Sequence, residues 1–404
     1  MRRGESSAAA VSSISVRQLR KAASNSQAVN GLTHTFYRYP ARFSPAFVAS
    51  AIEQFSTPGQ LVLDPYMGGG TTIVEAFARN RKAVGCDLNS LAVFVTRAKT
   101  SRLEDRDQSA VSHWATHIVP TLSYHTVTDE LAELICPYRT KNLALPRSRP
   151  AKKLMALAML SLNKLTSVSA QNFARAVLLN VAQWALNNRE EAPSLARIRA
   201  RISSTCNEMS FALIELEKRR IENGPLAPEP VLIQDSAVEL PFKSPFVNGE
   251  KVDLVVTSPP YPGIHILYHR WQVDGRKETP APYWIAGCYD GKGASFYNFA
   301  DRREQNEDAY FIESLKTLCS VRKIMRDGAL MIQLIAFSNP KRQLPRYLEN
   351  MTNAGFAEVR EATSEGQLRA FRRIWRVVPS RAWYANLKGK TNSSREVVLL
   401  HRAI

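Results

Sequence analysis

Two short turns carry the residues whose types and spacing could do chemistry. The first, DPYMGGGTT at residues 64–72, follows the apolar run LVL and contains three consecutive glycines. Because glycine has no Cβ, a ligand can approach the backbone closely at such a turn. The spacing matches neither a phosphate-binding P-loop nor a complete G-x-G-x-x-G dinucleotide motif. A tight turn with a purely structural purpose is the alternative interpretation.

An acidic residue follows this turn at a distance typical of nucleoside binding. Asp87, in the sequence GCDLN, comes after the next apolar strand pattern, AVGC. In doubly wound sheets a carboxylate at the end of the second strand holds the ribose hydroxyls of a nucleoside cofactor. Asp87 could instead cap the helix that follows, and the two roles are compatible.

The second turn, TSPPY at residues 257–261, follows the buried-strand pattern VDLVV. Consecutive prolines fix φ and remove two N–H donors, so the turn is stiff. It presents the Ser258 hydroxyl and the Pro259 carbonyl as acceptors beside the ring of Tyr261. We predict a slot for a planar group that carries an amine. Prolines that merely end a strand are the structural alternative.

These turns need a sheet that brings the ends of separate strands together. Residues 33–103 contain a strand, the glycine turn, a helix, a second strand and a helix, which indicates a doubly wound α/β sheet. Strand and helix patterns resume over 231–404, whereas 104–230 is a helical stretch. We therefore predict one Rossmann-like sheet domain in two parts, interrupted by a helical insertion. Residues 1–32, rich in Ser, Ala and Arg, are expected to form a flexible basic arm.

Composition and charge restrict the class of protein and its partners. The 404 residues include 54 Lys plus Arg against 36 Asp plus Glu, a formal net charge of +18, which points to a polyanion such as nucleic acid. At 45% hydrophobic and 22% charged, the composition excludes global disorder and a membrane bundle. No run approaches the ~18 apolar residues of a spanning helix. The five cysteines form no C-x-x-C pair, so we expect a soluble protein of a reducing, cytoplasmic compartment.

Three segments have the composition of nucleic-acid-binding surfaces. Residues 262–308 and 368–384 interleave aromatic and basic residues, and 138–153 carries six basic residues and no acidic one. Aromatic rings stack on bases, and basic side chains contact phosphates. Part of the aromatic set will belong to the core instead, and 138–153 could be a solvated loop. His265 and His269 have the spacing of metal ligands, but no third ligand is apparent, so no metal site is predicted.

Together the motifs DPYMGGGTT, GCDLN, QDSAVEL and TSPPY resemble those of the S-adenosylmethionine-dependent DNA amino-methyltransferases. TSPPY is similar to the Ser-Pro-Pro-Tyr motif of the cytosine-N4 type. The resemblance covers residues 33–103 and 231–400, and it implies S-adenosyl-L-methionine as the cofactor.

The resemblance also assigns residues to this cofactor. It places the methionine part at the glycine turn, the ribose at Asp87 and the adenine amino group near Asp235. The turn residues that match by position are Asp64, Tyr66, Gly68 and Gly70. Tyr66 stands where the family usually has Phe, and Gly69 where it often has Ser. The segment FYRYPARFSP, with Arg42 and Phe43, is similar to the family's segment beside the methionine end.

The activity implied is site-specific methylation of the N4 amine of cytosine in double-stranded DNA, with the base flipped out of the helix. The catalytic motif would be Ser258, Pro259, Pro260 and Tyr261. Serine is too weakly basic to remove the proton first, so Ser258 would orient the amine, and Tyr261 would stack on the base.

Other activities stay open. Adenine-N6 methylation of DNA is the nearest alternative, followed by methylation of an RNA amine and by a catalytically silent DNA-binding module. A restriction-modification or related defence context is expected, in the cytoplasm of a bacterium or archaeon and associated with the nucleoid through DNA. The partners could then include a cognate restriction nuclease. No membrane partner is expected.

Overall fold

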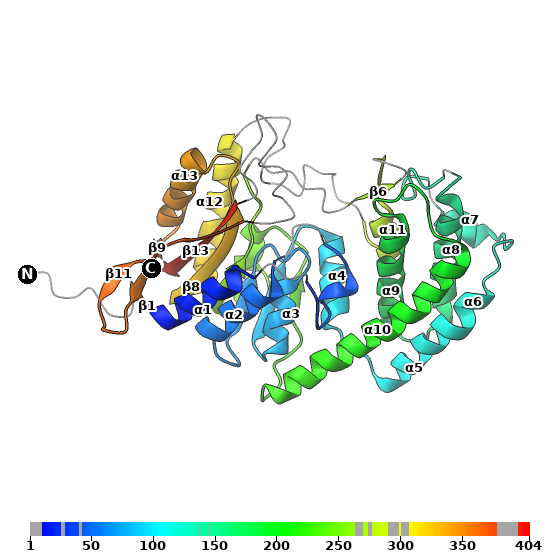
Figure 1. Cartoon of the computed structure of the whole chain (residues 1–404), viewed down its shortest axis with the longest axis horizontal. Helices are drawn as coiled ribbons and strands as arrows, with labels where there is room; N and C mark the ends of the chain where they lie inside the picture. The colour runs from blue at the N-terminus through cyan, green and yellow to red at the C-terminus, as the bar shows by residue number, and fades with distance from the viewer. Residues whose placement is uncertain are drawn as a thin grey trace, which may run out of the picture.

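The structure is a computed structural model of the chain. It describes residues 10–25, 29–39, 43–135, 137–144, 146–262, 270–273, 277–289, 299, 307–377 and 395–404. A lobe built on a large sheet and a lobe of helices lie next to each other, the sheet on the left and the helices on the right in Figure 1.

The large sheet has the strand order β12-β13-β8-β5-β2-β3-β4, and β9 also pairs with β13. Five neighbouring strands, from β8 to β4, run parallel, whereas β13 is antiparallel to β8 and β12. This confirms the predicted α/β class with a mostly parallel sheet. The strands are β2 (Leu61–Asp64), β3 (Lys82–Cys86), β4 (Val231–Ile233), β5 (Val252–Thr257), β8 (Met325–Ala336), β9 (Phe356–Glu358), β12 (Ile374–Val377) and β13 (Arg395–Ala403).

Helices cover both faces of the sheet, which explains why its strands are apolar throughout. In β2, Leu61 and Leu63 enter one core and Val62 enters the other. The first core packs against α12 (Glu307–Ile324) and α13 (Pro340–Asn353). The second packs against α1 (Ser13–Ala23), α2 (Pro45–Phe55) and α3 (Thr71–Ala78).

The start of the described chain differs from the flexible arm expected over residues 1–32. It forms β1 (Ala10–Ser12) and α1, and the Ser12 side chain caps α1 by accepting from the Ile14 N–H. Val16 and Leu19 on α1 are fully buried in the core that α2 also contacts. The Ser- and Arg-rich composition masked this apolar stripe. A small sheet joins β1 to β10 (Arg360–Ala362), and β10 to β11 (Leu368–Ala370).

The helical lobe follows α4 (Ser90–Thr100) and lies in the chain between β3 and β4. Its long helix α10 (Leu195–Glu222) runs diagonally across the lobe and reaches α3 (Figure 1). The other helices are α5 (Asp105–His113), a π-helical turn (Trp114–Ile118), α6 (Val119–Thr121), α7 (Asp129–Leu134), α8 (Arg149–Leu160) and α9 (Val168–Leu186). Short 3₁₀ turns are His34–Phe36, Ser161–Lys164, Ala237–Phe242 and Phe246–Asn248.

The core of this lobe takes in later parts of the chain as well. The hairpin of β6 (Trp271–Val273) and β7 (Lys277–Thr279) and the helix α11 (Ala281–Ala286) contribute to it. In the part of the chain that the structure describes, no helix has the length and apolar character needed to span a membrane.

Candidate functional site

The two turns singled out in the sequence lie at one edge of the sheet. The first follows β2 at Asp64, and the second follows β5 at Thr257. Because β2 lies between β3 and β5 and all three are parallel, their carboxyl ends share that edge. Asp87, directly after β3, is at the same edge. This is where doubly wound sheets bind ligands.

Hydrogen bonds to the Asp64 side chain link the two turns. Its side chain is buried, and its Oδ1 accepts hydrogen bonds from the Thr257 hydroxyl at 2.7 Å and from the Tyr66 N–H at 3.1 Å. Nearby, the Thr72 hydroxyl donates to the Val256 carbonyl at 3.1 Å. Burial raises the pKa of Asp64 to about 6, although the Thr257 hydroxyl opposes the shift. In this structure Asp64 therefore fixes the position of one turn against the other.

Two of the three glycines are required by packing. A Cβ at Gly69 would lie 2.9 Å from the Cβ of Tyr39, and a Cβ at Gly70 would lie 2.4 Å from Oγ1 of Thr96. Gly70 also has a φ of 74°, which L side chains rarely adopt. The structural interpretation of the glycines thus holds for these two positions, in addition to any ligand contact.

A buried lysine that sequence reasoning missed supports the same turn. Lys99 on α4 is 1% exposed, and its Nζ donates to the Gly69 carbonyl at 2.6 Å. Its only signal in the sequence is a basic residue on the apolar face of a helix. Together with Tyr39 and Thr96, Lys99 packs the turn between α4 and the segment before α2.

Asp87 bonds both to the glycine turn and to the residue that caps the next helix, without being the N-cap itself. Its Oδ2 accepts from the Gly68 N–H and its Oδ1 from the Asn89 N–H, each at 2.9 Å. The N-cap of α4 is Asn89, whose side chain accepts from the Leu91 N–H. Burial raises the pKa of Asp87 to about 6, while its side chain stays partly exposed. Each carboxylate oxygen keeps acceptor capacity for a ribose hydroxyl, so Asp87 fits the predicted nucleoside site.

Asp235 lies just beyond β4, next to the end of β3. Its carbonyl accepts from the Cys86 thiol at 3.2 Å, which joins the ends of the two strands. Its carboxylate pairs with Lys243 Nζ at 2.5 Å and accepts from the Ser236 N–H at 2.7 Å. The bond to Lys243 lowers the pKa of Asp235. The carboxylate is therefore an anion at neutral pH and is about one-third exposed, at 32%.

The residues of TSPPY make contacts that the sequence did not reveal. The Ser258 hydroxyl lies 3.0 Å from the Tyr261 hydroxyl, and Tyr261 donates to Oε1 of Glu396 at 3.0 Å. The Pro260 carbonyl accepts from the Tyr310 hydroxyl at 2.8 Å. Pro259 is buried. The turn is thus held from α12 and from β13.

The arginines of the 368–384 segment are largely used inside the molecule. Arg376 pairs with Glu396, Arg373 with Glu358 and Arg369 with Glu361. The clamp on a nucleic-acid backbone that we expected here stays a prediction: Arg376 is largely buried, whereas Arg372 and Arg369 are exposed. Arg381 lies outside the described residues.

The aromatic segment 262–308 is partly core. Trp271, Tyr283 and Trp284 are 1–2% exposed, and their polar atoms bond to Tyr37, to Asn89 and to the Leu134 carbonyl. Burial rules out base stacking by these three rings. Other aromatic, histidine and basic residues of this segment lie outside the described residues: His265, Tyr268, His269, Arg276, Phe296, Tyr297, Arg302 and Arg303.

The segment predicted to lie beside the glycine turn, residues 36–45, is likewise partly buried and partly outside the described residues. Phe43 is buried and packs on Phe47 with ring centroids 5.8 Å apart, whereas Arg42 is outside the described residues. Tyr66 is partly exposed, and its ring meets Phe299 edge-on at 5.6 Å. Within the described ranges, no three His, Cys, Asp or Glu side chains form a group that could hold a metal ion.

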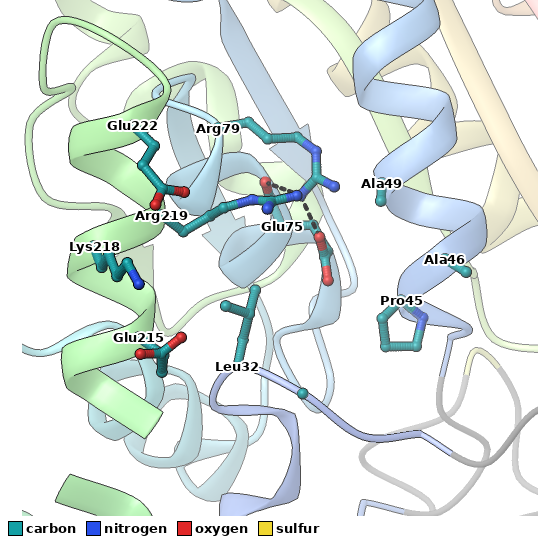
Figure 2. Close-up of a pocket in the computed structure, with 11 residues that line it drawn as sticks. Leu32, Pro45, Ala46, Ala49, Glu75, Arg79, Glu215, Lys218, Arg219 and Glu222 are labelled. Atoms are coloured by element: carbon teal, nitrogen blue, oxygen red, sulfur yellow. Dashed lines mark hydrogen bonds and ion pairs between the residues drawn. The ribbon is translucent and has the colours of Figure 1, made fainter. Parts of the chain in front are cut away.

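An open pocket of about 500 Å³ lies elsewhere, between α2, α3 and α10. Figure 2 shows Glu75 of α3 paired with Arg79, the residue after α3, and side chains of α10 facing those of α2 across the pocket. His34 contacts Glu75 at 2.7 Å behind it. Its lining mixes acidic and basic groups and includes none of the predicted site residues. We therefore place the candidate site at the carboxyl ends of β2, β3 and β5.

Comparisons with known proteins agree with the first part of this site. Residues 14–95 match the sequence family described as DNA methylase, of the N6/N4 methyltransferase type. The match includes the glycine turn and Asp87 and ends before TSPPY. This family implies S-adenosyl-L-methionine as the methyl donor.

Two curated relatives are type II methyltransferases. The chain is 26% identical over 253 residues to M.MvaI of Kocuria varians, covering 57% of this chain and 53% of that protein. It is 24% identical over 71 residues to M.MjaII of Methanocaldococcus jannaschii, covering 18% of this chain and 13% of that protein. The chain thus aligns with about half of the first relative's length and with less of the second.

Similar solved structures include TrmN from Thermus thermophilus and the rRNA methyltransferase AviRa from Streptomyces viridochromogenes. The TM-scores are 0.33 and 0.31, at 10% and 12% identity. The matched regions cover 90% of this chain and 49% of TrmN, and 92% of this chain and 90% of AviRa.

Proposed function

We propose that this chain is a DNA amino-methyltransferase that transfers a methyl group to the exocyclic N4 amine of cytosine in duplex DNA. One observation carries the proposal: the Asp64–Thr257 hydrogen bond holds the glycine turn beside the Ser258 turn. A nucleoside-binding turn and an amine-binding turn thus share one edge of the sheet. The match to the N6/N4 DNA methylase family supports the class of substrate.

The residues present suit S-adenosyl-L-methionine, which supplies an electrophilic methyl group on a sulfonium. Asp87 would hold the ribose hydroxyls, since its two oxygens keep free acceptor positions beside Gly68. The anionic Asp235 would accept from the adenine amino group. Tyr66, Gly68 and Gly70 would line the methionine part, with Asp64 supporting them from below.

The Ser258 hydroxyl and the Pro259 carbonyl would accept hydrogen bonds from the two N–H groups of the target amine. An aromatic amine is a poor nucleophile because its lone pair is delocalised into the ring. Two well-placed acceptors favour a pyramidal nitrogen and stabilise the positive charge that develops on it. Tyr261 and Pro260 would shape the slot for the flipped base. Flipping the base out of the duplex costs a few kcal/mol, because its stacking and pairing are lost.

Cytosine and adenine present similar amidine edges to such a slot. The serine at the first position of the motif favours cytosine. The N6 activity on adenine is the second candidate, because the matched family includes both types. A restriction-modification context, with a cognate nuclease as partner, is proposed from the likeness to two type II methyltransferases. Sequence recognition would then involve the helical lobe, residues 262–308, or both.

Incubation with methyl-labelled cofactor and duplex DNA, followed by nucleoside mass spectrometry, tests the proposal. We expect N4-methylcytosine as the product. N6-methyladenine would replace the first candidate with the second. Label in RNA alone, or in no nucleic acid at all, would overturn the proposed function.

A further inference from the structure

We propose that Glu396 is a positioning residue that fixes the direction of the Ser258 hydroxyl, so that Ser258 offers its lone pairs to the target amine. The inference rests on the proposed function and adds a residue from the far end of the chain to it. It comes from a chain of hydrogen bonds that links Ser258, Tyr261, Glu396 and Arg376.

Glu396 and Arg376 are directly opposite each other on the antiparallel strands β13 and β12. Both side chains are largely buried, at 3% and 14% exposure. Arg376 donates from Nε and from Nη2 to the same oxygen, Oε2, at 2.7 and 2.6 Å. In this ion pair Arg376 engages only Oε2 of the carboxylate, so Oε1 can accept from another donor.

The donor at Oε1 is the Tyr261 hydroxyl, at 3.0 Å. An ionised carboxylate can only accept, so Tyr261 has to direct its single proton toward Glu396. The contact of 3.0 Å between Tyr261 and Ser258 then requires Ser258 to donate and the phenol oxygen to accept. With its proton committed to Tyr261, the Ser258 oxygen has only lone pairs left for a ligand.

This direction matters for an amine. The exocyclic amino group of cytosine presents two N–H donors. A serine hydroxyl with its proton directed at this group would place two donors against each other, and no hydrogen bond would form. The hydrogen bonds from Ser258 to Tyr261 and from Tyr261 to Glu396 exclude this orientation of the serine hydroxyl before the base binds. The site is preorganised in this sense. Glu396 touches neither base nor cofactor in this assignment, because it acts through Tyr261.

The variant Glu396→Gln tests the assignment with little change in shape. Arg376 has no acceptor, so it should bind the oxygen of the new amide and turn the amide NH₂ toward Tyr261. Tyr261 would then accept from that NH₂ and donate to Ser258, which reverses the chain. We expect kcat to fall on the order of 100-fold. The dissociation constants for cofactor and for DNA should stay within about twofold, since bound-state contacts are kept. A kcat within about threefold of the wild-type value would overturn the assignment.

Two further variants separate positioning from general stability. Glu361 is a matched control, because it is equally buried, at 3% exposure, and paired with Arg369 at 2.7 Å in the small sheet. We expect Glu361→Gln to leave kcat unchanged. Tyr261→Phe breaks the chain, so Glu396→Gln should have no further effect on kcat in that background. Independent, multiplicative effects of the two substitutions would contradict the relay.

Nuclear magnetic resonance of ¹³Cζ-tyrosine gives a readout that does not depend on activity. The Tyr261 signal, assigned by its loss in Tyr261→Phe, should show a donating phenol in the wild-type chain and shift in Glu396→Gln. An accepting phenol in the wild-type chain would overturn the assignment even if Glu396→Gln failed to fold. A wild-type chain that methylates no nucleic acid would instead refute the proposed function, while this measurement still tests Glu396.

Discussion

The Thr257 hydroxyl donates a hydrogen bond to Asp64 over 2.7 Å, although the two residues are 193 positions apart in the chain. Each is the last residue of its strand, Asp64 of β2 and Thr257 of β5, and both are buried. The bond makes the geometry of the glycine turn depend on that of the Ser258 turn. Changes at either residue should therefore affect stability and activity together.

The raised pKa of Asp64 predicts a pH dependence of stability. Its pKa is about 6 in the folded chain against an ordinary value of 3.8, so the folded state binds more protons between those values. The free energy of unfolding should accordingly fall as pH rises from about 4 to about 6. Asp64→Asn removes this contribution, on the order of 1–3 kcal/mol, and makes the profile less steep, since Asp87 still contributes with the same sign.

Urea unfolding at several pH values across this window measures the effect. Asp327→Asn is the control, because this carboxylate is 90% exposed and lies near the start of β8, at the opposite end of the sheet. It should leave the slope of the wild-type profile unchanged. An identical slope in Asp64→Asn would refute the burial argument.

Asp87 predicts how cofactor affinity depends on pH. Only the ionised carboxylate can accept from both ribose hydroxyls, and its pKa in the folded chain is about 6. The affinity for S-adenosyl-L-methionine should therefore rise as pH increases from about 5 to 7 and level off above that. Titration calorimetry at three pH values would measure the dissociation constants. In Asp87→Asn we expect weaker binding without this rise, and unchanged binding would remove the ribose assignment.

Ser258→Ala should separate catalysis from binding. We expect kcat to fall on the order of 100-fold, because the amine loses an acceptor that acts mainly in the transition state. The dissociation constant for cofactor should stay nearly unchanged. Ser338→Ala is a matched control, since Ser338 follows the neighbouring strand β8 and bonds to Gln343. Equal weakening of turnover and cofactor binding by Ser258→Ala would show that the amine site is misplaced.

We expect a substitution in the glycine turn to reduce the free energy of unfolding more than a substitution at a glycine outside it. Gly59 and Gly70 both have a positive φ, of 84° and 74°, but a Cβ at Gly59 meets open space. Each change to Ala should cost about 1–2 kcal/mol for the backbone. Gly70→Ala should cost about 1–3 kcal/mol more, because its Cβ collides with Thr96. Equal losses of unfolding free energy would contradict the close packing of this turn.

The sequence predicted the sheet and the two turns because those features are local. LVL and VDLVV are short apolar runs that end at turn residues, and parallel strands place such ends at one edge. The contact between Tyr261 and Glu396 is not local. It depends on β13 running antiparallel beside β8, which no pattern around Glu396 specifies.

Composition was an incomplete guide in two other places. Ser and Arg at the start of the chain suggested an arm, whereas Val16 and Leu19 anchor a packed helix. Interleaved aromatic and basic residues over 262–308 indicated a nucleic-acid surface with some core aromatics, but not which ones; Trp271 and Tyr283 are in the core and bond to Tyr37 and Asn89. In each case burial, which composition does not report, decided the outcome.

The insertion of the helical lobe between β3 and β4 has a consequence for the order of folding. These strands are paired neighbours in the sheet, although the chain between residues 86 and 231 separates them. Closing a loop of that length in an unfolded chain costs on the order of 4 kcal/mol of entropy. Residues of the insertion supply most of the lobe's apolar core, so their collapse can shorten the gap before the strands meet. We therefore expect β4, and with it Asp235, to join the sheet late, as a slow phase in refolding.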